Sequence, residues 1–478
     1  MANIYFSTTI ETVRDRIEMA NFHIAMYPWY AAGHIIPYIH LANELATRGH
    51  RISFLLPKNT QTQFQHLIDL HHQNLITFHP ITVPHVDGLP PGTELVSDIP
   101  LPLNHELAIA MDLTRDQVKR VLISAKPDLV FHDFAYWVPE IANELRIKSV
   151  CYHIFSATAM AYGFVPAKYV PRDRPITEEE VRVPPDGYPS SVVVPRGHEA
   201  RSLFSLTRPF GEGKILFYER LTASMRNCDA LAIRTCRELE GKYCDYIESQ
   251  YGKPVLLTGS ALPESENTVL EDRWAKWLSG FEPGSVVFCS FGSQYILEKE
   301  QFQELVLGIE QSGQPFFIAL KPPVGCQTVE EGLPERFEDR VKGTGVVYGG
   351  WVQQPQMLSH PSVGCFVNHC GSGSVWESLM SDNQIVFLPR FGDQTLYSKL
   401  FAQELKVAVS VEKDENGWFP KDRLSKAIKS VMDKDSKVGI MVKNNHANLK
   451  KVLGQPGFMS GYIDRFVHNL QELVNPII

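Results

Sequence analysis

Short apolar runs alternate with amphipathic segments along most of the chain. Between the runs, segments such as "IIPYIHLANELATRG" and "EKEQFQELVLGIEQSG" have the periodicity of helices. The candidate strands are residues 22–29, 50–57, 127–134, 148–155 and 229–236 in the first half, and 285–292, 315–320, 345–351, 363–369 and 384–390 in the second. Strands that alternate with amphipathic helices are typical of βαβ units and parallel sheets. The pattern predicts an α/β protein with two Rossmann-like, doubly wound parallel-sheet domains.

The two halves are joined by a stretch rich in Pro, Gly, Ser and Glu. We expect residues 251–271 to be a linker between an N-terminal domain (1–250) and a C-terminal domain (272–455). Residues 456–478 carry a helix that can pack back on the N-terminal domain. The Pro-rich residues 172–199 are expected to form a long surface loop. Two such domains that face each other form a cleft at the carboxyl ends of both sheets, where open α/β sheets bind ligands.

Composition excludes several classes of protein. The net charge of −8 argues against nucleic acid as the main partner, because phosphate binding needs a basic face. No apolar stretch is long enough to span a membrane, and the N-terminus lacks the apolar region of a secretion signal. Eight scattered cysteines without a C-x-x-C pair favour free thiols in a reducing compartment. We therefore expect a cytoplasmic protein, and a monomer.

The stretch "HCGSGSVWES" places a glycine turn between a buried strand and a helix. Unpaired N–H groups and the positive end of the helix dipole make such a turn an anion site. Gly371 and Gly373 allow close approach of the backbone, and Ser372 and Ser374 add hydroxyl donors, so a phosphate would fit. An isolated G-x-G is also a common plain turn. The spacing matches neither a P-loop nor the G-x-G-x-x-G of nicotinamide enzymes.

Glu377, one turn later, can accept two ribose hydroxyls or simply complement the helix dipole.

A histidine and an aspartate follow two of the predicted strands. His34, in "AAGHIIP", lies near a helix N-terminus, whose dipole keeps an imidazole neutral, as a general base requires. Asp133, in "VFHDF", ends another strand and would lie at the same sheet edge. The two predict a His–Asp pair in which the carboxylate fixes the tautomer, although a lone histidine is more often structural. His132 points to the opposite face and is the weaker candidate.

The segment 351–394 resembles the 44-residue donor-binding box of the plant UDP-sugar glycosyltransferases. The matching residues are Trp351, Gln354, Pro355, Leu358, His360, Gly364, Phe366, His369, Cys370, Gly371, Ser374, Glu377, Pro389, Asp393 and Gln394. The resemblance extends over nearly the whole chain. The segments "VVFCSFGS", "RTCRELEG" and "GWVQQP" are most similar to the branch-forming clade, which adds a sugar onto a sugar of a flavonoid or anthocyanin glycoside.

The resemblance implies a GT-B fold, a UDP-sugar as co-substrate, a phenolic glycoside as acceptor, and neither a metal nor another cofactor. It places the catalytic pair on His34 and Asp133. The implied donor-site residues are Trp351 on uracil, Val352 beside it, Gln354 near the ribose or base, Glu377 on the ribose hydroxyls, Ser293, His369, Gly371, Ser372, Gly373 and Ser374 around the diphosphate, and Asp393 and Gln394 on the donor sugar.

One departure concerns the donor. The family usually has Trp-Asn after "HCG", where this chain has Ser372-Gly373. The change removes a wall beside the sugar and a phosphate donor, and it leaves UDP-glucose, UDP-xylose and UDP-rhamnose open. Asp433-Lys434-Asp435 matches a D-x-D metal motif but is expected to be a solvated turn.

The expected reaction is an inverting sugar transfer in which His34 takes the proton of an acceptor hydroxyl. Aromatic residues near the pair either line an acceptor pocket or belong to the core: Tyr27, Trp29, Tyr30, Phe134, Tyr136 and Trp137. Two alternatives remain: the same chemistry on an aglycone or terpenoid hydroxyl, and a non-catalytic UDP-sugar-binding protein.

Overall fold

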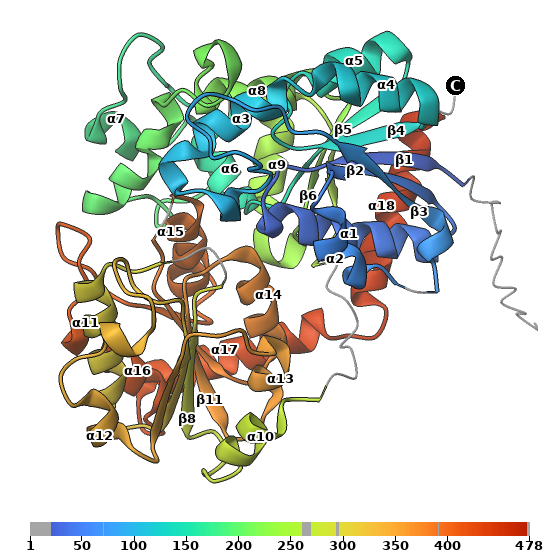
Figure 1. Cartoon of the computed structure of the whole chain (residues 1–478). Coiled ribbons are helices and arrows are strands. Elements are labelled where there is room, and N and C mark those ends of the chain that lie inside the picture. Colours follow the sequence, from blue (N-terminus) through green and yellow to red (C-terminus); the bar gives the residue numbers. More distant parts are fainter. Residues whose placement is uncertain (1–20, 70, 261–268, 293–295, 391, 476–478) are drawn as a thin grey trace, which may run out of the picture.

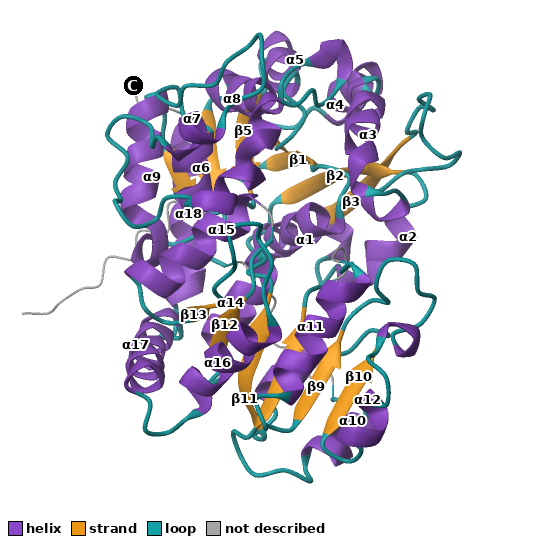
Figure 2. Ribbon diagram, turned by 90° about the vertical axis from the view of Figure 1, so that its left-hand side faces the viewer, coloured by secondary structure: helices purple, strands orange, loops and turns teal. Residues whose placement is uncertain are grey.

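The computed structural model describes residues 21–69, 71–260, 269–292, 296–390 and 392–475. Within these residues the chain forms two lobes, each built on a parallel sheet with helices on both faces (Figures 1 and 2). The expected α/β class with two doubly wound domains is confirmed.

The N-terminal sheet has seven described strands in the order β3-β2-β1-β4-β5-β6-β7, all parallel. They are β1 His23–Tyr27, β2 Arg51–Pro57, β3 Ile76–Ile81, β4 Leu129–His132, β5 Lys148–His153, β6 Ala230–Ile233 and β7 Val255–Leu257. The strand order reverses between β1 and β4. Ligands of doubly wound sheets bind at such a switch point.

The C-terminal sheet repeats this arrangement with six described strands in the order β10-β9-β8-β11-β12-β13. They are β8 Val286–Ser290, β9 Phe316–Ala319, β10 Gly345–Tyr348, β11 Val363–Asn368, β12 Gln384–Phe387 and β13 Val409–Ser410. Its switch point lies between β8 and β11. Most of the strands are buried on both faces, which explains their continuous apolar runs.

Helices cover both faces of each sheet. Those of the first lobe are α1 Ala32–Thr47, α2 Gln61–Phe64, α3 Asn104–Asp112, α4 Arg115–Ala125, α5 Val138–Leu145, α6 Ala157–Gly163, α7 Glu178–Arg182, α8 Phe217–Asn227 and α9 Arg237–Tyr251. Those that follow are α10 Asp272–Leu278, α11 Lys299–Glu310, α12 Phe337–Val341, α13 Gln354–Ser359, α14 Ser372–Met380, α15 Gly392–Lys399, α16 Lys421–Met432, α17 Lys437–Leu453 and α18 Phe458–Val474.

The last helix, α18, returns to the N-terminal lobe, where it is drawn in red in Figure 1. Phe466 packs edge-on against Phe131 of β4, with ring centroids 6.0 Å apart. The Tyr462 hydroxyl donates to Glu238 (2.7 Å) and accepts from the amide of Arg237 (2.9 Å). These contacts tie the end of the described chain to the N-terminal sheet.

The structure differs from the sequence prediction at the linker. Helix α9 runs to Tyr251, and β7 adds an edge strand to the N-terminal sheet inside the expected linker, residues 251–271. The N-terminal domain therefore extends beyond residue 250. A three-residue strand within a Pro- and Gly-rich stretch gives no periodic signal. Residues 261–268 of the expected linker lie outside the described residues.

The expected surface loop at 172–199 is part of the contact between the lobes. It contains α7, and its Val181 and Val193 side chains are fully buried. Ser190 donates a hydrogen bond to Glu404, at the end of the π-helical turn after α15 (3.0 Å). Tyr243 of α9 donates to the same carboxylate (3.0 Å). The two lobes are therefore joined by partly buried polar contacts as well as by the linker.

Candidate active site

His34 and Asp133 meet at the switch point of the N-terminal sheet. His34 lies in the first turn of α1, directly after β1, and Asp133 follows β4. Because Tyr27 and His132 are register partners in these strands, the two chains leave the sheet side by side. His34 Nδ1 lies 2.7 Å from Asp133 Oδ2. Both residues are buried, at 8% and 1% exposed.

The backbone fixes the Asp133 carboxylate. Its Oδ1 accepts from the amides of Trp29 (2.8 Å) and Phe134 (2.6 Å), and these bonds leave Oδ2 to face His34. An ionised carboxylate only accepts hydrogen bonds, so Nδ1 of His34 carries the proton. Nε2 then holds the free lone pair, and this pair of residues can act as a general base.

Aromatic rings surround the imidazole. Phe134 and Phe155 both meet the His34 ring edge-on, at centroid distances of 5.3 and 5.6 Å. Phe210 and Phe217 pack against Phe134 at 5.7 and 5.8 Å. Phe155, Phe210 and Phe217 are only partly buried, which leaves ring surface available to a planar ligand.

Of the six aromatic residues named from the sequence, some belong to the protein core and others lie close to His34. Tyr27 and Tyr30 are fully buried and share a 2.6 Å hydrogen bond, so they belong to the core. Trp137 is also internal, since its Nε1 donates to Asp112 (2.9 Å). Trp29 and Phe134 stack on each other next to His34 at 5.3 Å. Tyr136 is partly buried beside the Arg220 guanidinium.

The glycine turn opens α14 at the switch point of the C-terminal sheet. Gly371 is the N-cap residue, and no side chain caps the N–H groups of the first turn, which include those of Ser372 and Gly373. Cys370 adopts a left-handed backbone (φ 63°), and its amide donates to the buried Asn368 Oδ1 (2.9 Å). With these N–H groups and the helix dipole, the turn has the features that can bind an anion.

The ring of His369 fixes where glycine is required. A Cβ on Gly371 would lie 2.5 Å from His369 Nε2, and one on Gly292, after β8, would lie 3.5 Å from the same ring. His369 therefore lies between the two loops of the switch point. Burial lowers the pKa of His369 to about 4, so the ring is neutral at pH 7. Gly373 has open space where a Cβ would project.

Glu377, Gln354 and Ser374 form one hydrogen-bonded group. Gln354, the first residue of α13, donates from Nε2 to Glu377 Oε2 (2.6 Å) and to Ser374 Oγ (3.3 Å). Burial raises the pKa of Glu377, while Gln354 and the charge of Arg234 lower it. The structure thus brings together three residues that the sequence placed around one nucleotide.

The other residues expected at the donor site lie just before α13 and at the start of α15. Trp351 is 76% exposed, which leaves its ring free to stack on a base, whereas the Val352 side chain is 6% exposed and packs in the core. Asp393 and Gln394 open α15. Burial raises the pKa of Asp393 to about 6.

Three sequence candidates are not placed in this site by the described structure. Ser293 lies outside the described residues. His132 is fully buried below the site, where its Nδ1 contacts Ser224 Oγ (3.2 Å), and burial lowers its pKa to about 3. Asp433, Lys434 and Asp435 are exposed, and Asp433 accepts from the amide of Asp435 (3.0 Å) in a turn after α16.

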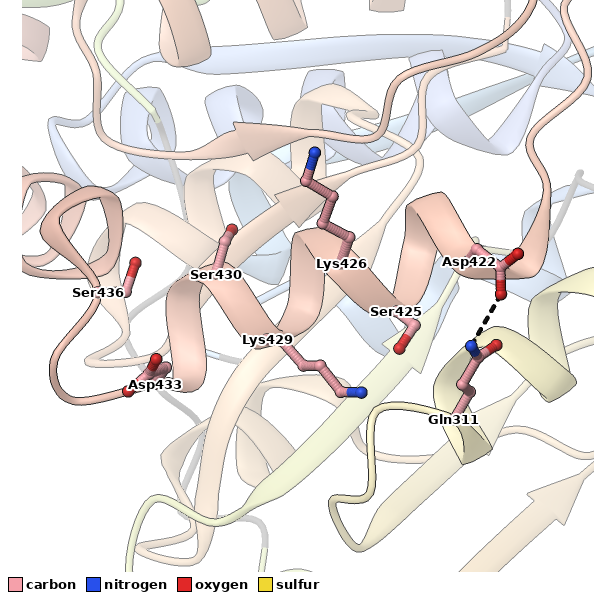
Figure 3. Close-up of a pocket in the computed structure, with 8 residues that line it drawn as sticks. All are labelled: Gln311, Asp422, Ser425, Lys426, Lys429, Ser430, Asp433 and Ser436. Atoms are coloured by element: carbon pink, nitrogen blue, oxygen red, sulfur yellow. Dashed lines mark hydrogen bonds between the residues drawn. The ribbon is translucent and has the colours of Figure 1, made fainter.

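Asp433 also borders a shallow polar hollow along α16, shown in Figure 3. The labelled side chains are those of Gln311, Asp422, Ser425, Lys426, Lys429, Ser430, Asp433 and Ser436. Gln311 donates to Asp422 (2.8 Å) across the hollow. None of these residues belongs to the two switch points, so the hollow is separate from the site.

The described residues give two further negative findings. No three of their His, Cys, Asp or Glu side chains are grouped as metal ligands. None of their helices combines the length and the apolar character needed to cross a bilayer. All eight cysteines, as expected, are free thiols.

Known proteins resemble this chain over most of its length. Residues 250–449 match the family model "UDP-glucoronosyl and UDP-glucosyl transferase". UDP-glycosyltransferase 79B9 of Arabidopsis thaliana is 55% identical over 95% of this chain and 98% of its own length. UDP-glycosyltransferase 79B6 of the same plant is 51% identical over 96% and 99%.

Solved structures show the same fold at low sequence identity. The Glycyrrhiza uralensis UGT73P12 structure, complexed with glycyrrhetinic acid 3-O-monoglucuronide, matches with a TM-score of 0.75 at 21% identity over 95% of this chain and 96% of that one. Arabidopsis thaliana UGT89C1 complexed with UDP-L-rhamnose matches with a TM-score of 0.72 at 20% identity over 94% and 99%. The chain thus has the expected GT-B fold and belongs to the plant UDP-glycosyltransferases, enzymes that transfer a sugar from a UDP-sugar to a plant metabolite.

Proposed function

We propose that this enzyme transfers the sugar with inversion, with His34 as general base and Asp133 as its partner. His34 Nε2 takes the proton of an acceptor hydroxyl. The hydroxyl oxygen then attacks the anomeric carbon as the bond to the diphosphate breaks, and its electrons leave with UDP. A single displacement inverts the anomeric centre. The observation that carries the proposal is the buried 2.7 Å contact between His34 and Asp133, from which Nε2 is left for substrate.

The donor side supplies electrostatic stabilisation. We place the diphosphate against the uncapped N–H groups of Ser372, Gly373 and Ser374, with His369 beside it. Preorganised donors aimed at a leaving group often contribute more to catalysis than any other single effect. Trp351 would stack on uracil, and Glu377 would accept the ribose hydroxyls. A Cβ at Gly373 would meet no atom within 4 Å, so this position lacks the wall that the family's usual Trp-Asn provides.

The acceptor that fits best is a flavonoid or anthocyanin glycoside, extended on one of its sugar hydroxyls. The partly exposed rings of Phe155, Phe210 and Phe217 offer flat apolar surface next to the base. This surface suits a planar phenolic body. The choice of a sugar hydroxyl rests on the resemblance of "VVFCSFGS" and "RTCRELEG" to the branch-forming clade.

Asp393 gives donor binding a predictable pH dependence. Its ionised form accepts two sugar hydroxyls, and its pKa is raised to about 6 by burial. As the pH falls through that value the carboxylate becomes protonated and loses acceptor capacity. We expect the ratio of the affinity for UDP-sugar to the affinity for UDP to decrease as the pH drops below about 6. Calorimetric titration at several pH values measures this ratio. In Asp393→Asn this ratio should be lower than in the wild type and should not change with pH. The same pH dependence in Asp393→Asn as in the wild type would contradict the assignment.

The substrate classes are tested by assaying each candidate donor against each acceptor type. UDP-glucose, UDP-xylose and UDP-rhamnose are each offered with a flavonoid glycoside, its aglycone and a terpenoid alcohol. We expect turnover mainly with the glycoside and a product with a sugar–sugar linkage of inverted configuration. Faster transfer to the aglycone would overturn the acceptor assignment, and retained configuration would overturn the mechanism.

A further inference from the structure

Helix α15, which carries Asp393 and Gln394, follows the C-terminal sheet but lies against the N-terminal lobe (Figures 1 and 2). Its neighbours there are α6 and η5, a 3₁₀ helix that runs from Gly197 to Thr207. The residues of α15 from Thr395 to Lys399 are buried. Contacts with the other lobe therefore help to fix where the first turn of α15 lies.

An ion pair joins the last residue of α15 to η5. The Nζ of Lys399 lies 2.9 Å from Glu199 Oε2. The same oxygen accepts from the amide of Arg196 (2.6 Å), which fixes the carboxylate on its own segment. The side chains of Lys399 and Glu199 are 6% and 22% exposed. A pair so shielded from water is weakly screened by salt, and loss of one partner leaves the other charge uncompensated.

The first residue of α15 contacts the same 3₁₀ helix. A Cβ on Gly392 would lie 3.2 Å from the carbonyl oxygen of Ser202 and 3.3 Å from Leu203 Cδ2. Glycine at this position lets the start of α15 approach the backbone of η5 closely. Both ends of α15 are thus in contact with η5, and Asp393 directly follows the first of these contacts.

We propose that Glu199 and Lys399 are positioning residues of the donor site. Through their ion pair, the N-terminal lobe holds α15 at the place from which Asp393 and Gln394 meet the donor sugar. The inference rests on the proposed placement of the sugar at these two residues. Because η5 ends shortly before Phe210, the segment that leads to the acceptor surface also positions the donor helix.

The test compares the affinity for a UDP-sugar with the affinity for UDP, by calorimetry, in Lys399→Met. Methionine keeps an apolar stem and removes the charge. UDP-glucose, UDP-xylose and UDP-rhamnose are titrated in turn, and the one that the wild type binds most tightly is used. We expect it to bind about five- to tenfold more weakly, a size typical of changes that act on a site without contacting the ligand. UDP lacks the sugar, so its affinity should stay within about twofold of the wild type.

Lys242→Met is the matched control. Lys242 also forms an ion pair between the lobes, with Glu404 (2.8 Å), but its side chain is 46% exposed and its partner lies beyond the end of α15. We expect both affinities to stay within about twofold of the wild type in this variant, because exposed ion pairs contribute little.

Two further variants test the contact with η5 from its other members. In a Lys399→Met background, Glu199→Gln should add less than about a twofold loss of UDP-sugar affinity, since the members of one ion pair are not additive. Gly392→Ala adds a Cβ that crowds Ser202 at the opposite end of α15. This variant should also weaken the binding of the UDP-sugar more than that of UDP.

The outcomes overturn different statements. If Asp393→Asn leaves the ratio of the two affinities unchanged, the proposed sugar site is wrong. If Asp393→Asn lowers the ratio while Lys399→Met does not, the inference fails and the sugar site stands. The same conclusion follows if Lys242→Met lowers the ratio as far as Lys399→Met, or if Lys399→Met weakens UDP and the UDP-sugar equally. An unchanged ratio in Gly392→Ala would also contradict the inference, and this measurement does not require the methionine variant to fold.

Discussion

His34→Ala is expected to lower kcat by about 10³-fold, within the range that a positioned general base contributes. In the proposed mechanism the His34 imidazole, oriented by its 2.7 Å contact to Asp133, takes the proton of the acceptor hydroxyl. The side chain does not belong to the donor loops, so UDP affinity should stay within about twofold of the wild type. Initial rates of UDP release, with UDP binding measured in parallel, check both statements.

The control is His468→Ala, which removes an exposed histidine on α18 and should leave turnover unchanged. A non-catalytic UDP-sugar-binding protein predicts no difference between His34→Ala and the wild type. If His34→Ala kept more than about a tenth of the activity, the imidazole would not be the general base.

The second large effect concerns stability. Arg220 and Asp112 form a fully buried bidentate ion pair, with Nη1–Oδ2 at 2.8 Å and Nη2–Oδ1 at 2.7 Å. The guanidinium also donates to the carbonyls of Phe134 (2.7 Å) and Phe210 (3.1 Å) beside the base. Asp112→Ala leaves the Arg220 guanidinium buried without its carboxylate partner, which lowers the free energy of unfolding by about 3–5 kcal/mol. For a domain of this size we expect calorimetry to show a fall in Tm of roughly 10 °C.

The exposed pair of Arg237 with Asp245, also at 2.8 Å, provides the comparison. Asp245→Ala should cost less than about 1 kcal/mol, because surface ion pairs contribute little. Arg220 donates to the carbonyls of Phe134 and Phe210, whose rings pack near His34. Asp112→Ala should therefore also raise the KM for the acceptor more than the KM for the UDP-sugar. Equal changes in Tm for Asp112→Ala and Asp245→Ala would contradict this explanation.

How far the fold could be predicted depended on strand burial. Strands such as β8 and β11 are buried on both faces, so they are continuous apolar runs that the hydropathy pattern identifies. By contrast, β3 at the sheet edge is partly exposed and contains Pro80, and β13 has only two residues. These strands carry too little apolar signal to be found in the sequence.

The site could be predicted where its residues end strands. His34 and Asp133 follow neighbouring parallel strands, and the glycine turn follows β11, so strand assignment alone brings each group to a sheet edge. The amides of Trp29 and Phe134 that fix Asp133 were not foreseen, because backbone donors have no sequence signature. Phe155 and Phe210 come from loops, whose positions the hydropathy pattern does not predict.

The most direct test of the proposed mechanism is a crystal structure with an unreactive 2-fluoro UDP-sugar and a flavonoid glycoside bound together. We expect diphosphate oxygens at the N–H groups of residues 372–374, and one acceptor hydroxyl about 3 Å from His34 Nε2, on the opposite side of the anomeric carbon from the diphosphate. A diphosphate bound away from the start of α14, or an acceptor hydroxyl beyond the reach of His34, would contradict the mechanism.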